Sequence, residues 1–268
     1  MVELNPNSLS DYIDQVEGLH KRIKGPLWFR GCSQSSHALL PSLYRKRQRE
    51  IGPSDLAQLE DLIFSRFRER SIPYHIRPLT DDFESLFIMQ HYGVPTRLLD
   101  WSENPLAGLF FAVRNAAFKI TNTGKQSFTN PAIVWVLDPS KWNKFAIGHV
   151  SFTGGILYAN HERVKAYKPI GKINELAPRP IALYGAHNSS RIVAQQGAFV
   201  LFGSDIKAME TYTSQQDLKN CLTKIIIKPK VIGKIRESLL RHGLTDSALF
   251  PDLEGLSRDL RRQFGFEH

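Results

Sequence analysis

The sequence predicts an α+β protein in which N-terminal helices pack on a mixed or antiparallel β-sheet. Apolar residues recur with a helical period up to about residue 118. The pattern is strand-like from about residue 119, and helices and strands do not alternate regularly. No Pro/Gly/Ser-rich linker and no internal repeat divides the chain. We therefore expect a single domain over 1–268, with a helical portion at about 1–118 and a strand-rich portion at about 119–268.

The first elements are predicted by hydrophobic period and capping residues. Residues 9–24 are expected to form a helix that is capped near Ser8 or Ser10. A strand follows at 26–32, and 54–72 has the pattern of a long amphipathic helix. The chain is therefore expected to begin with a helix, a strand and a second helix, in that order.

Two further helices flank a short strand or turn at 96–102. Residues 81–92 form the first helix, which glycine and proline terminate. The second, at 105–118, begins with proline and can be capped by Asn104 or Ser102. These signals place polar residues of 96–102 just before a helix N-terminus.

The second part of the chain is expected to supply most of the sheet. Residues 121–130 read as a polar hairpin or loop, and 145–177 carries only weak strand and loop signals. Strands are predicted at 132–139, 191–203 and 222–229. The strand at 191–203 can divide into two around a bulge at Gly197. A helix at 231–244, ending at glycine, precedes the closing segment.

The chain is basic, with 35 Lys and Arg against 26 Asp and Glu. Such a balance favours polyanionic partners. One local basic run contains Arg45, Lys46, Arg47 and Arg49. It is either a solvated helical face or a surface that follows the phosphates of a nucleic acid.

Composition also bounds where the protein acts. No stretch approaches about 18 consecutive apolar residues, so no membrane contact is expected. The N-terminus lacks the basic start and apolar run of a secretory signal. Two cysteines, Cys32 and Cys221, cannot make a disulfide framework or, alone, a zinc site. We expect reduced thiols and a cytoplasmic protein.

The familiar catalytic and metal-binding motifs are absent from the sequence. It contains no phosphate-binding glycine loop, no dinucleotide fingerprint, no H-E-x-x-H, no C-x-x-C and no G-x-S-x-G. The nine histidines show no metal-ligand spacing, so no metal is expected. A site must be sought among polar residues embedded in apolar segments.

Arg30 is the first such residue, because it follows three apolar residues and precedes Gly31. A half-buried arginine needs a partner. It can form a structural ion pair, for instance with Asp100, or a fork that binds a phosphate or ribose hydroxyl. Gly31 would let a ligand or backbone approach closely.

Two other segments carry polar residues in apolar surroundings. Arg97, Asp100 and Ser102 stand just before a predicted helix N-terminus, which is a ready site for an anion. Arg191 and Gln195 alternate along a predicted strand and should share one face.

Four separated blocks resemble the FRG domain family, named for its Phe-Arg-Gly. The block at 28–45 resembles the opening signature, and 90–113 resembles the longest and most specific block. Residues 191–199 and 249–256 resemble the third and closing blocks, so the resemblance runs from about residue 20 to 260. Ser102 stands where the family often has threonine, which keeps the hydroxyl.

The FRG domain is similar, in the spacing of its blocks, to the split-sheet ADP-ribosyltransferase fold. By that analogy the catalytic residues are Arg30, Ser102 and Gln195. The same analogy gives a set of residues that bind NAD, the substrate: Arg30, Gly31, Thr96, Arg97, Asp100, Trp101 and Arg191. The basic run Arg45, Lys46, Arg47 and Arg49 would bind a nucleic-acid acceptor.

Glutamine at position 195 cannot act as a general base. Another carboxylate can supply that role, with Asp100, Glu103 and Glu175 as candidates, or the acceptor needs little base. A further alternative is a site that binds NAD without turning it over.

The resemblance implies an ADP-ribosyltransferase-like toxin or phage-defence effector. Its acceptor would be a nucleic acid, favoured by the basic charge, or a protein, and an antitoxin could neutralise it. The alternative is a non-enzymatic nucleotide- or nucleic-acid-binding module. A third possibility is a metal-dependent hydrolase using Asp100, Glu103 and Asp138.

Overall fold

The fold is that of a computed structural model of the chain. The structure describes residues 2–45, 53–75, 77–148, 152, 154–168, 177–185 and 189–266. None of the helices in these ranges combines the length and apolar composition that crossing a bilayer requires.

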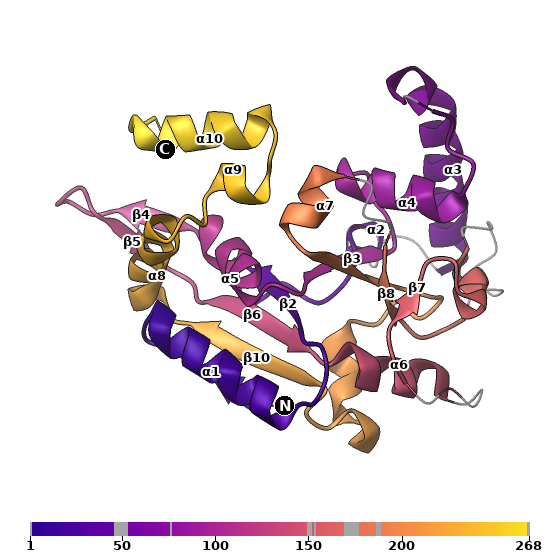
Figure 1. Cartoon of the computed structure of the whole chain (residues 1–268), viewed down its shortest axis with the longest axis horizontal. Helices are drawn as coiled ribbons and strands as arrows, with labels where there is room; N and C mark the ends of the chain where they lie inside the picture. The colour runs from indigo at the N-terminus through magenta and orange to yellow at the C-terminus, as the bar shows by residue number, and fades with distance from the viewer. Residues whose placement is uncertain are drawn as a thin grey trace.

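A mixed β-sheet forms the centre of the fold (Figure 1). Its eight strands among the described residues follow the order β1-β10-β6-β2-β3-β9-β8-β7. The strands are β1 (Val2–Leu4), β2 (Trp28–Cys32), β3 (Leu98–Ser102), β6 (Ala132–Leu137), β7 (Leu157–Tyr158), β8 (Ile181–Tyr184), β9 (Gly197–Leu201) and β10 (Leu222–Ile227). Neighbours are antiparallel except for β1 with β10 and β7 with β8. The predicted α+β class with a mixed sheet is confirmed.

The sheet is weakly joined at its middle. Strands β2 and β3 share one registered pair, Phe29 with Ser102, whereas β2 with β6 and β3 with β9 each share five. Beyond that pair the two central strands separate, at Arg30 on β2. The unpaired edges of β2 and β3 create the opening in which the candidate site lies.

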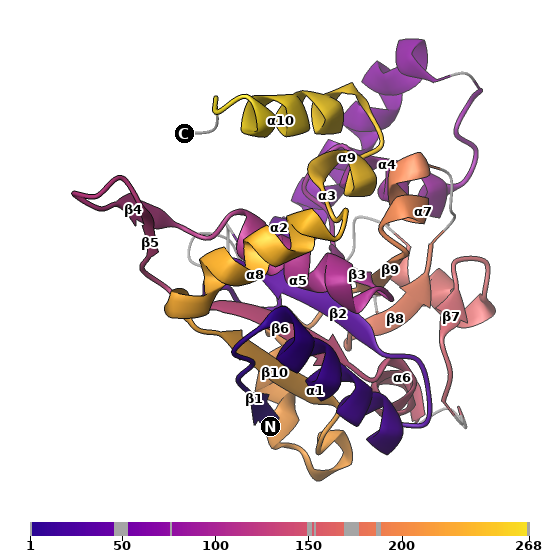
Figure 2. The same ribbon diagram turned by 60° about the vertical axis from the view of Figure 1, so that its left-hand side comes forward.

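Helices cover both faces of the sheet (Figures 1 and 2). They are α1 (Leu9–Arg22), α2 (Ser42–Arg45), α3 (Pro53–Ser71), α4 (Asp82–His91), α5 (Pro105–Arg114), α6 (Pro139–Ile147), α7 (Ser190–Ala194), α8 (Pro229–Arg241), α9 (Asp246–Leu249) and α10 (Leu253–Gln263). Apolar residues of α1, α5 and α8 pack over β2, β6 and β10. Those of α4 and α7 pack over β3, β8 and β9. Residues of α2 and α3 belong to a third cluster on the opposite face.

Several predicted helix ends are confirmed by their caps. Ser8 accepts a hydrogen bond from the amide of Asp11 at the start of α1. Asn104 caps α5, which begins with proline. Gly243 follows α8 with a φ of 81°, the left-handed conformation that glycine adopts at helix ends. The predicted polar hairpin is also present, as β4 (Phe118–Ile120) and β5 (Gln126–Phe128).

The predicted strand over 191–203, single or divided by a bulge at Gly197, is confirmed only at Gly197–Leu201, which form β9, and is wrong for the residues before it. Ser189 accepts a hydrogen bond from the amide of Ile192 and starts the short helix α7. Gln195 is its C-cap, and Gln196 adopts a positive φ of 47° before β9 begins. Arg191 and Gln195 therefore stand on a helical turn and do not alternate along a strand.

The predicted boundary near residue 119 separates elements along the chain but not in space. The two central strands, β2 and β3, come from the helical portion, and α8 and α10 come from the strand-rich portion. The site at the centre of the sheet is thus built from both portions.

Candidate functional site

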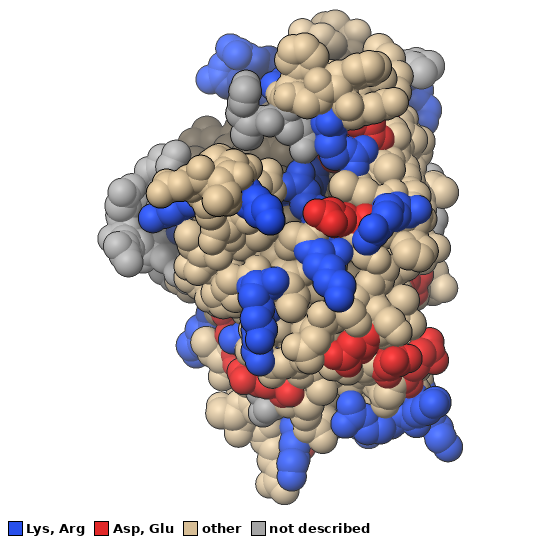
Figure 3. Space-filling view, turned by 90° about the vertical axis from the view of Figure 1, so that its left-hand side faces the viewer, with Lys and Arg blue, Asp and Glu red and all other residues tan. Residues whose placement is uncertain are grey.

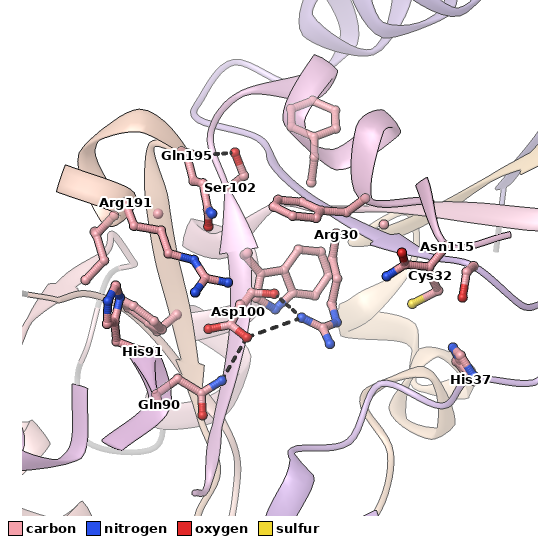
Figure 4. A pocket seen from close by; sticks show the side chains of 18 of the residues that line it. Arg30, Cys32, His37, Gln90, His91, Asp100, Ser102, Asn115, Arg191 and Gln195 are labelled. Carbon is pink, nitrogen blue, oxygen red and sulfur yellow. Dashed lines mark hydrogen bonds and ion pairs between the residues drawn. The ribbon is translucent and has the colours of Figure 1, made fainter. Parts of the chain in front are cut away.

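A cavity of about 310 Å³ opens where β2 and β3 separate (Figure 4). It lies between α5 on one side and α4 and α7 on the other. Its polar lining comprises Arg30, Cys32, Ser33, His37, Arg45, Gln90, His91, Asp100, Ser102, Asn115, Arg191 and Gln195. Four of these residues, Arg30, Cys32, Asp100 and Ser102, come from the two central strands, so the weak junction of the sheet determines the position of the cavity.

Arg30 occupies the gap between the two strands. Its Nη1 donates to the backbone carbonyl of Asp100 at 2.5 Å and lies 4.0 Å from the Asp100 carboxylate. Its Nε is buried and has no hydrogen-bond partner among the described residues. Both predicted roles thus have a structural basis: Arg30 has a structural partner, and it also lines a cavity.

Three arginines give the cavity a positive charge. Arg45 donates from Nε to the carbonyl of Leu40, and Arg191 lies 4.2 Å from the ring of Phe250. Burial lowers the pKa of both guanidinium groups, and the nearby Arg30 lowers that of Arg45 further. Asp100 is the one carboxylate among the lining residues that the structure describes. The cavity therefore favours an anion.

Two histidines, His91 and His37, stand at the cavity wall, and the pKa of each is lowered. Burial lowers the pKa of His91, and the charge of Arg191 lowers it further. Burial also lowers the pKa of His37, with added contributions from Arg45 and Arg30. A bound anion would oppose the effect of the arginines and favour protonation.

The carboxylate of Asp100 is held at the cavity mouth. It accepts a hydrogen bond from Nε2 of Gln90 at 2.8 Å, and its side chain is 57% exposed. Arg30 and Arg191 lie on either side of it (Figure 4). Asp100 is thus oriented, accessible and placed between two cations.

Ser102 and Gln195 meet at the edge of the cavity. The Ser102 hydroxyl donates to the backbone carbonyl of Gln195 at 2.6 Å and accepts from the amide of Asn104 at 2.9 Å. The side-chain amide of Gln195 donates to the carbonyl of Leu249 at 2.9 Å. The structure brings both residues to the cavity that Arg30 lines, but their polar groups already have partners.

Thr96 and Arg97, predicted to bind a cofactor, do not line the cavity. Arg97 is 1% exposed, and its guanidinium donates to Glu60 and to the carbonyls of Tyr167 and Phe202. Thr96 is fully buried and donates to the side-chain carbonyl of Gln90. The prediction is corrected: Arg97 ties α3 to the sheet, and Thr96 supports Gln90.

Gly31 lines the cavity, but its lack of a side chain serves packing. A Cβ atom at this position would lie 2.2 Å from the carbonyl oxygen of Gly108 and 2.3 Å from the amide nitrogen of Ala112. Helix α5 thus approaches the backbone of β2 directly. The close approach expected at Gly31 is made by this helix.

Gly31→Ala is expected to lower the free energy of unfolding by about 3 kcal/mol, because α5 must move away from β2. Urea unfolding measures the loss. Gly18→Ala on α1, where a Cβ meets no atom within 4 Å, is the matched control and should not destabilise the protein. Equal stability of the two variants would show that α5 does not pack on β2 as described.

Sequence reasoning missed the contributions of Gln90, His91 and His37 to the cavity. Arg45, predicted to bind nucleic acid, is exposed and also lines the cavity. Lys46, Arg47, Arg49 and Glu175 lie outside the described residues. Gln90 and His91 belong to the QHYG block, so an isolated polar pair at a helix end was the available signal.

Two other carboxylates considered from the sequence do not line the cavity. Glu103 accepts a hydrogen bond from the hydroxyl of Tyr184, and Asp138 caps α6. Within the described ranges, no three His, Cys, Asp or Glu side chains are grouped as a metal site requires. Cys32 and Cys221 are free and buried, and burial raises the pKa of both thiols.

Comparison with known families places part of the chain. Residues 25–119 match the family model described as the FRG domain. The blocks at 28–45 and 90–113 lie within this match, and those at 191–199 and 249–256 lie beyond it. No curated protein and no solved structure matches the chain.

Proposed function

We propose that the chain, whose residues 25–119 match the FRG domain model, is an ADP-ribosyltransferase-like enzyme whose cavity binds NAD. The observation that carries this proposal is the convergence of Arg30, Arg45 and Arg191 on one cavity that Ser102 and Gln195 also line. A pyrophosphate is a dianion, and guanidinium groups bind phosphate through paired N–H donors. The cavity volume of about 310 Å³ lies in the range of small-molecule sites.

The buried donors of the cavity support a bound ligand. Arg30 Nε and Trp101 Nε1 are buried and lack a hydrogen-bond partner among the described residues. Buried donors are normally satisfied in native proteins. Both atoms are closed off in the empty cavity, so a small rearrangement of its wall on binding would let a ligand or the water it orders supply the missing acceptors.

The lining residues fit the chemistry of ADP-ribosyl transfer. Nicotinamide leaves with the electrons of its bond to ribose, and the acceptor forms a bond to the same ribose carbon. The arginines would hold the pyrophosphate, and Ser102 would orient the nicotinamide ribose. Asp100 would stabilise the positive charge that develops on the ribose and take the proton of the acceptor.

Asp100 is the better candidate base in the described part of the cavity, because Gln195 cannot accept a proton. Its carboxylate is exposed at the mouth and oriented by Gln90. Glu103, in contrast, is engaged by Tyr184 and does not line the cavity. The general-base role therefore falls to the strand β3 that also carries Ser102.

A second function, nucleotide binding without turnover, is favoured by one observation. The hydroxyl of Ser102 and the amide of Gln195 are both bonded to backbone carbonyls. If these bonds persist in the complex, the chain would bind NAD and leave it intact. The two functions share the arginines and differ only in nicotinamide release.

NAD binding is expected to tighten as the pH falls from 8 to 6, by up to about tenfold. The bound pyrophosphate raises the lowered pKa of His91 and His37, so the complex takes up a proton that the free protein does not. Titration calorimetry across this pH range measures the dissociation constant.

His91→Gln should reduce the pH dependence to the share of His37, whereas His20→Gln on α1 is the matched control and should leave it intact. Binding that weakens as the pH falls would contradict an anionic ligand beside His91. Undetectable NAD binding at every pH would remove both proposed functions of the cavity.

The biological setting stays a prediction. A toxin or phage-defence role, an antitoxin partner and action in the cytoplasm follow from the family resemblance alone.

A further inference from the structure

A second, larger recess lies beside the candidate cavity. It has a volume of about 720 Å³ and is formed by the end of α5, the β4–β5 hairpin, α8, α9 and α10. Its charged lining consists of Arg114, Arg236, Arg258, Arg261 and Asp246. We name it the basic groove. Figure 3 shows the side of the molecule on which these elements lie, where Lys and Arg side chains follow one another across the middle of the surface.

The one carboxylate among the described lining residues does not neutralise the groove. Asp246 is 6% exposed, and its Oδ1 lies 2.6 Å from Arg114 and 3.7 Å from Arg258. It is therefore shared between two arginines. Arg261 is exposed and has no ion-pair partner among the described residues. Arg258 also forms an ion pair with Glu254, but the arginines that line the groove still outnumber the carboxylates that line it.

The arginines of the groove also lie close enough to repel one another. Burial lowers the pKa of Arg114; Asp246 opposes this effect, and the charges of Arg258 and Arg191 add to it. Such a cluster is unfavourable without an anion. The groove thus gains most from a partner that offers several negative charges at intervals.

The basic groove adjoins the cavity. Asn115 lines both of them. The ring of Phe250 lies 4.7 Å from Arg114 and 5.1 Å from Arg258 on the groove side, and 4.2 Å from Arg191 on the cavity side. A chain-like ligand in the groove would therefore lead to the place where the cavity would present ADP-ribose.

We propose that the basic groove binds a single strand of nucleic acid and delivers it to the cavity as the acceptor, which rests on the function proposed above. Arginines at intervals along a groove match the repeating phosphates of a strand. Phe118 offers a ring for stacking, and Asn115 and Gln126 offer amides for base edges. An acidic protein segment would use the arginines but not the ring or the amides.

The test is binding of fluorescein-labelled single-stranded RNA and DNA of about 12 nucleotides, followed by anisotropy without NAD at several salt concentrations. Arg261→Glu should weaken binding about tenfold and reduce the slope of log affinity against log salt by about 0.7, the share of one phosphate contact. Arg236→Gln combined with Arg261→Gln should lower the slope about twice as much. Thermal unfolding of each variant confirms that it is folded.

Arg70→Glu on α3 is the matched control, because it makes the same charge change at an exposed site far from the groove. It should retain nearly the wild-type affinity. Equal weakening by Arg70→Glu and Arg261→Glu would overturn the groove, since binding would then follow net charge alone. Absence of binding, tighter binding of a duplex, or displacement of the strand by polyglutamate at equal charge would also overturn it.

The outcome is separable from NAD chemistry. If the chain releases nicotinamide but binds no strand, the proposed function holds and the proposal for the groove fails. If the chain binds the strand at the groove but neither binds nor cleaves NAD, the groove is a nucleic-acid site and the proposed enzyme activity fails.

Discussion

Arg30→Ala is expected to reduce the rate of nicotinamide release from NAD by about 10²- to 10³-fold, the usual loss when one fixed donor to the reacting group is removed. Arg30 is the one arginine of the cavity that stands in the gap between β2 and β3. Its Nη1 is fixed by the carbonyl of Asp100 at 2.5 Å, and its Nε remains without a partner among the described residues. The loss should appear in both NAD affinity and turnover.

The change also removes the bond from Arg30 to the Asp100 carbonyl, so stability must be measured beside activity. Arg30→Lys keeps the charge but not the paired donors, and it should recover less than a tenth of the lost rate. Arg22→Ala on α1 is the control for loss of one arginine and should release nicotinamide at the wild-type rate. Wild-type release by a folded Arg30→Ala variant would show that Arg30 serves only the sheet.

Arg97→Met is expected to lower the free energy of unfolding by about 3–5 kcal/mol, because it leaves the buried carboxylate of Glu60 without its cation. Both side chains are almost fully buried, and Arg97 also bonds the carbonyls of Tyr167 and Phe202. One guanidinium thus satisfies groups on three segments. Urea unfolding measures the change in the midpoint.

The double variant Glu60→Leu with Arg97→Met separates the charge from the packing. It should regain a large part of the loss, since no unpaired carboxylate remains. Arg68→Met, which breaks an exposed ion pair with Asp82, is the matched control and should cost less than about 1 kcal/mol. An Arg97→Met protein of normal stability that no longer binds NAD would restore the predicted cofactor role of Arg97.

Local signals in the sequence predicted the elements well wherever a cap or a period was strong. Ser8, Asn104 and Gly243 mark helix ends because each satisfies or accommodates backbone groups within its own turn. The helix α7 was missed because its five residues are apolar enough to continue into β9. Only the cap at Ser189 distinguished it from a strand.

The sequence alone could not distinguish an arginine that lines the cavity from one that is buried in the core. Arg30 stands in the apolar strand β2 and Arg97 directly precedes the apolar strand β3, so from the sequence either could hold a ligand. Arg97 is buried and therefore cannot reach a ligand. Its burial depends on an ion pair with Glu60, which is 37 residues away in the chain. In the same way, the sequence could not predict that Arg45 lines the cavity, because the cavity exists only where β2 and β3 separate.

The meeting of Arg30, Ser102 and Gln195 was predicted from the family resemblance, not from periodicity. The structure brings them to one cavity through neighbouring elements, β2, β3 and the turn before β9. Their hydrogen bonds were beyond prediction because the partner of the Gln195 amide, Leu249, belongs to the C-terminal segment. That contact also couples the cavity to α9.

The most direct test of the central claim is mass spectrometry of the protein, RNA and DNA after incubation of the wild-type chain with NAD. The account predicts free nicotinamide together with the added mass of ADP-ribose on a nucleic acid strand, and neither product with Arg30→Ala. NAD that stays intact with every acceptor, although it binds, would contradict the enzyme and leave a nucleotide-binding cavity.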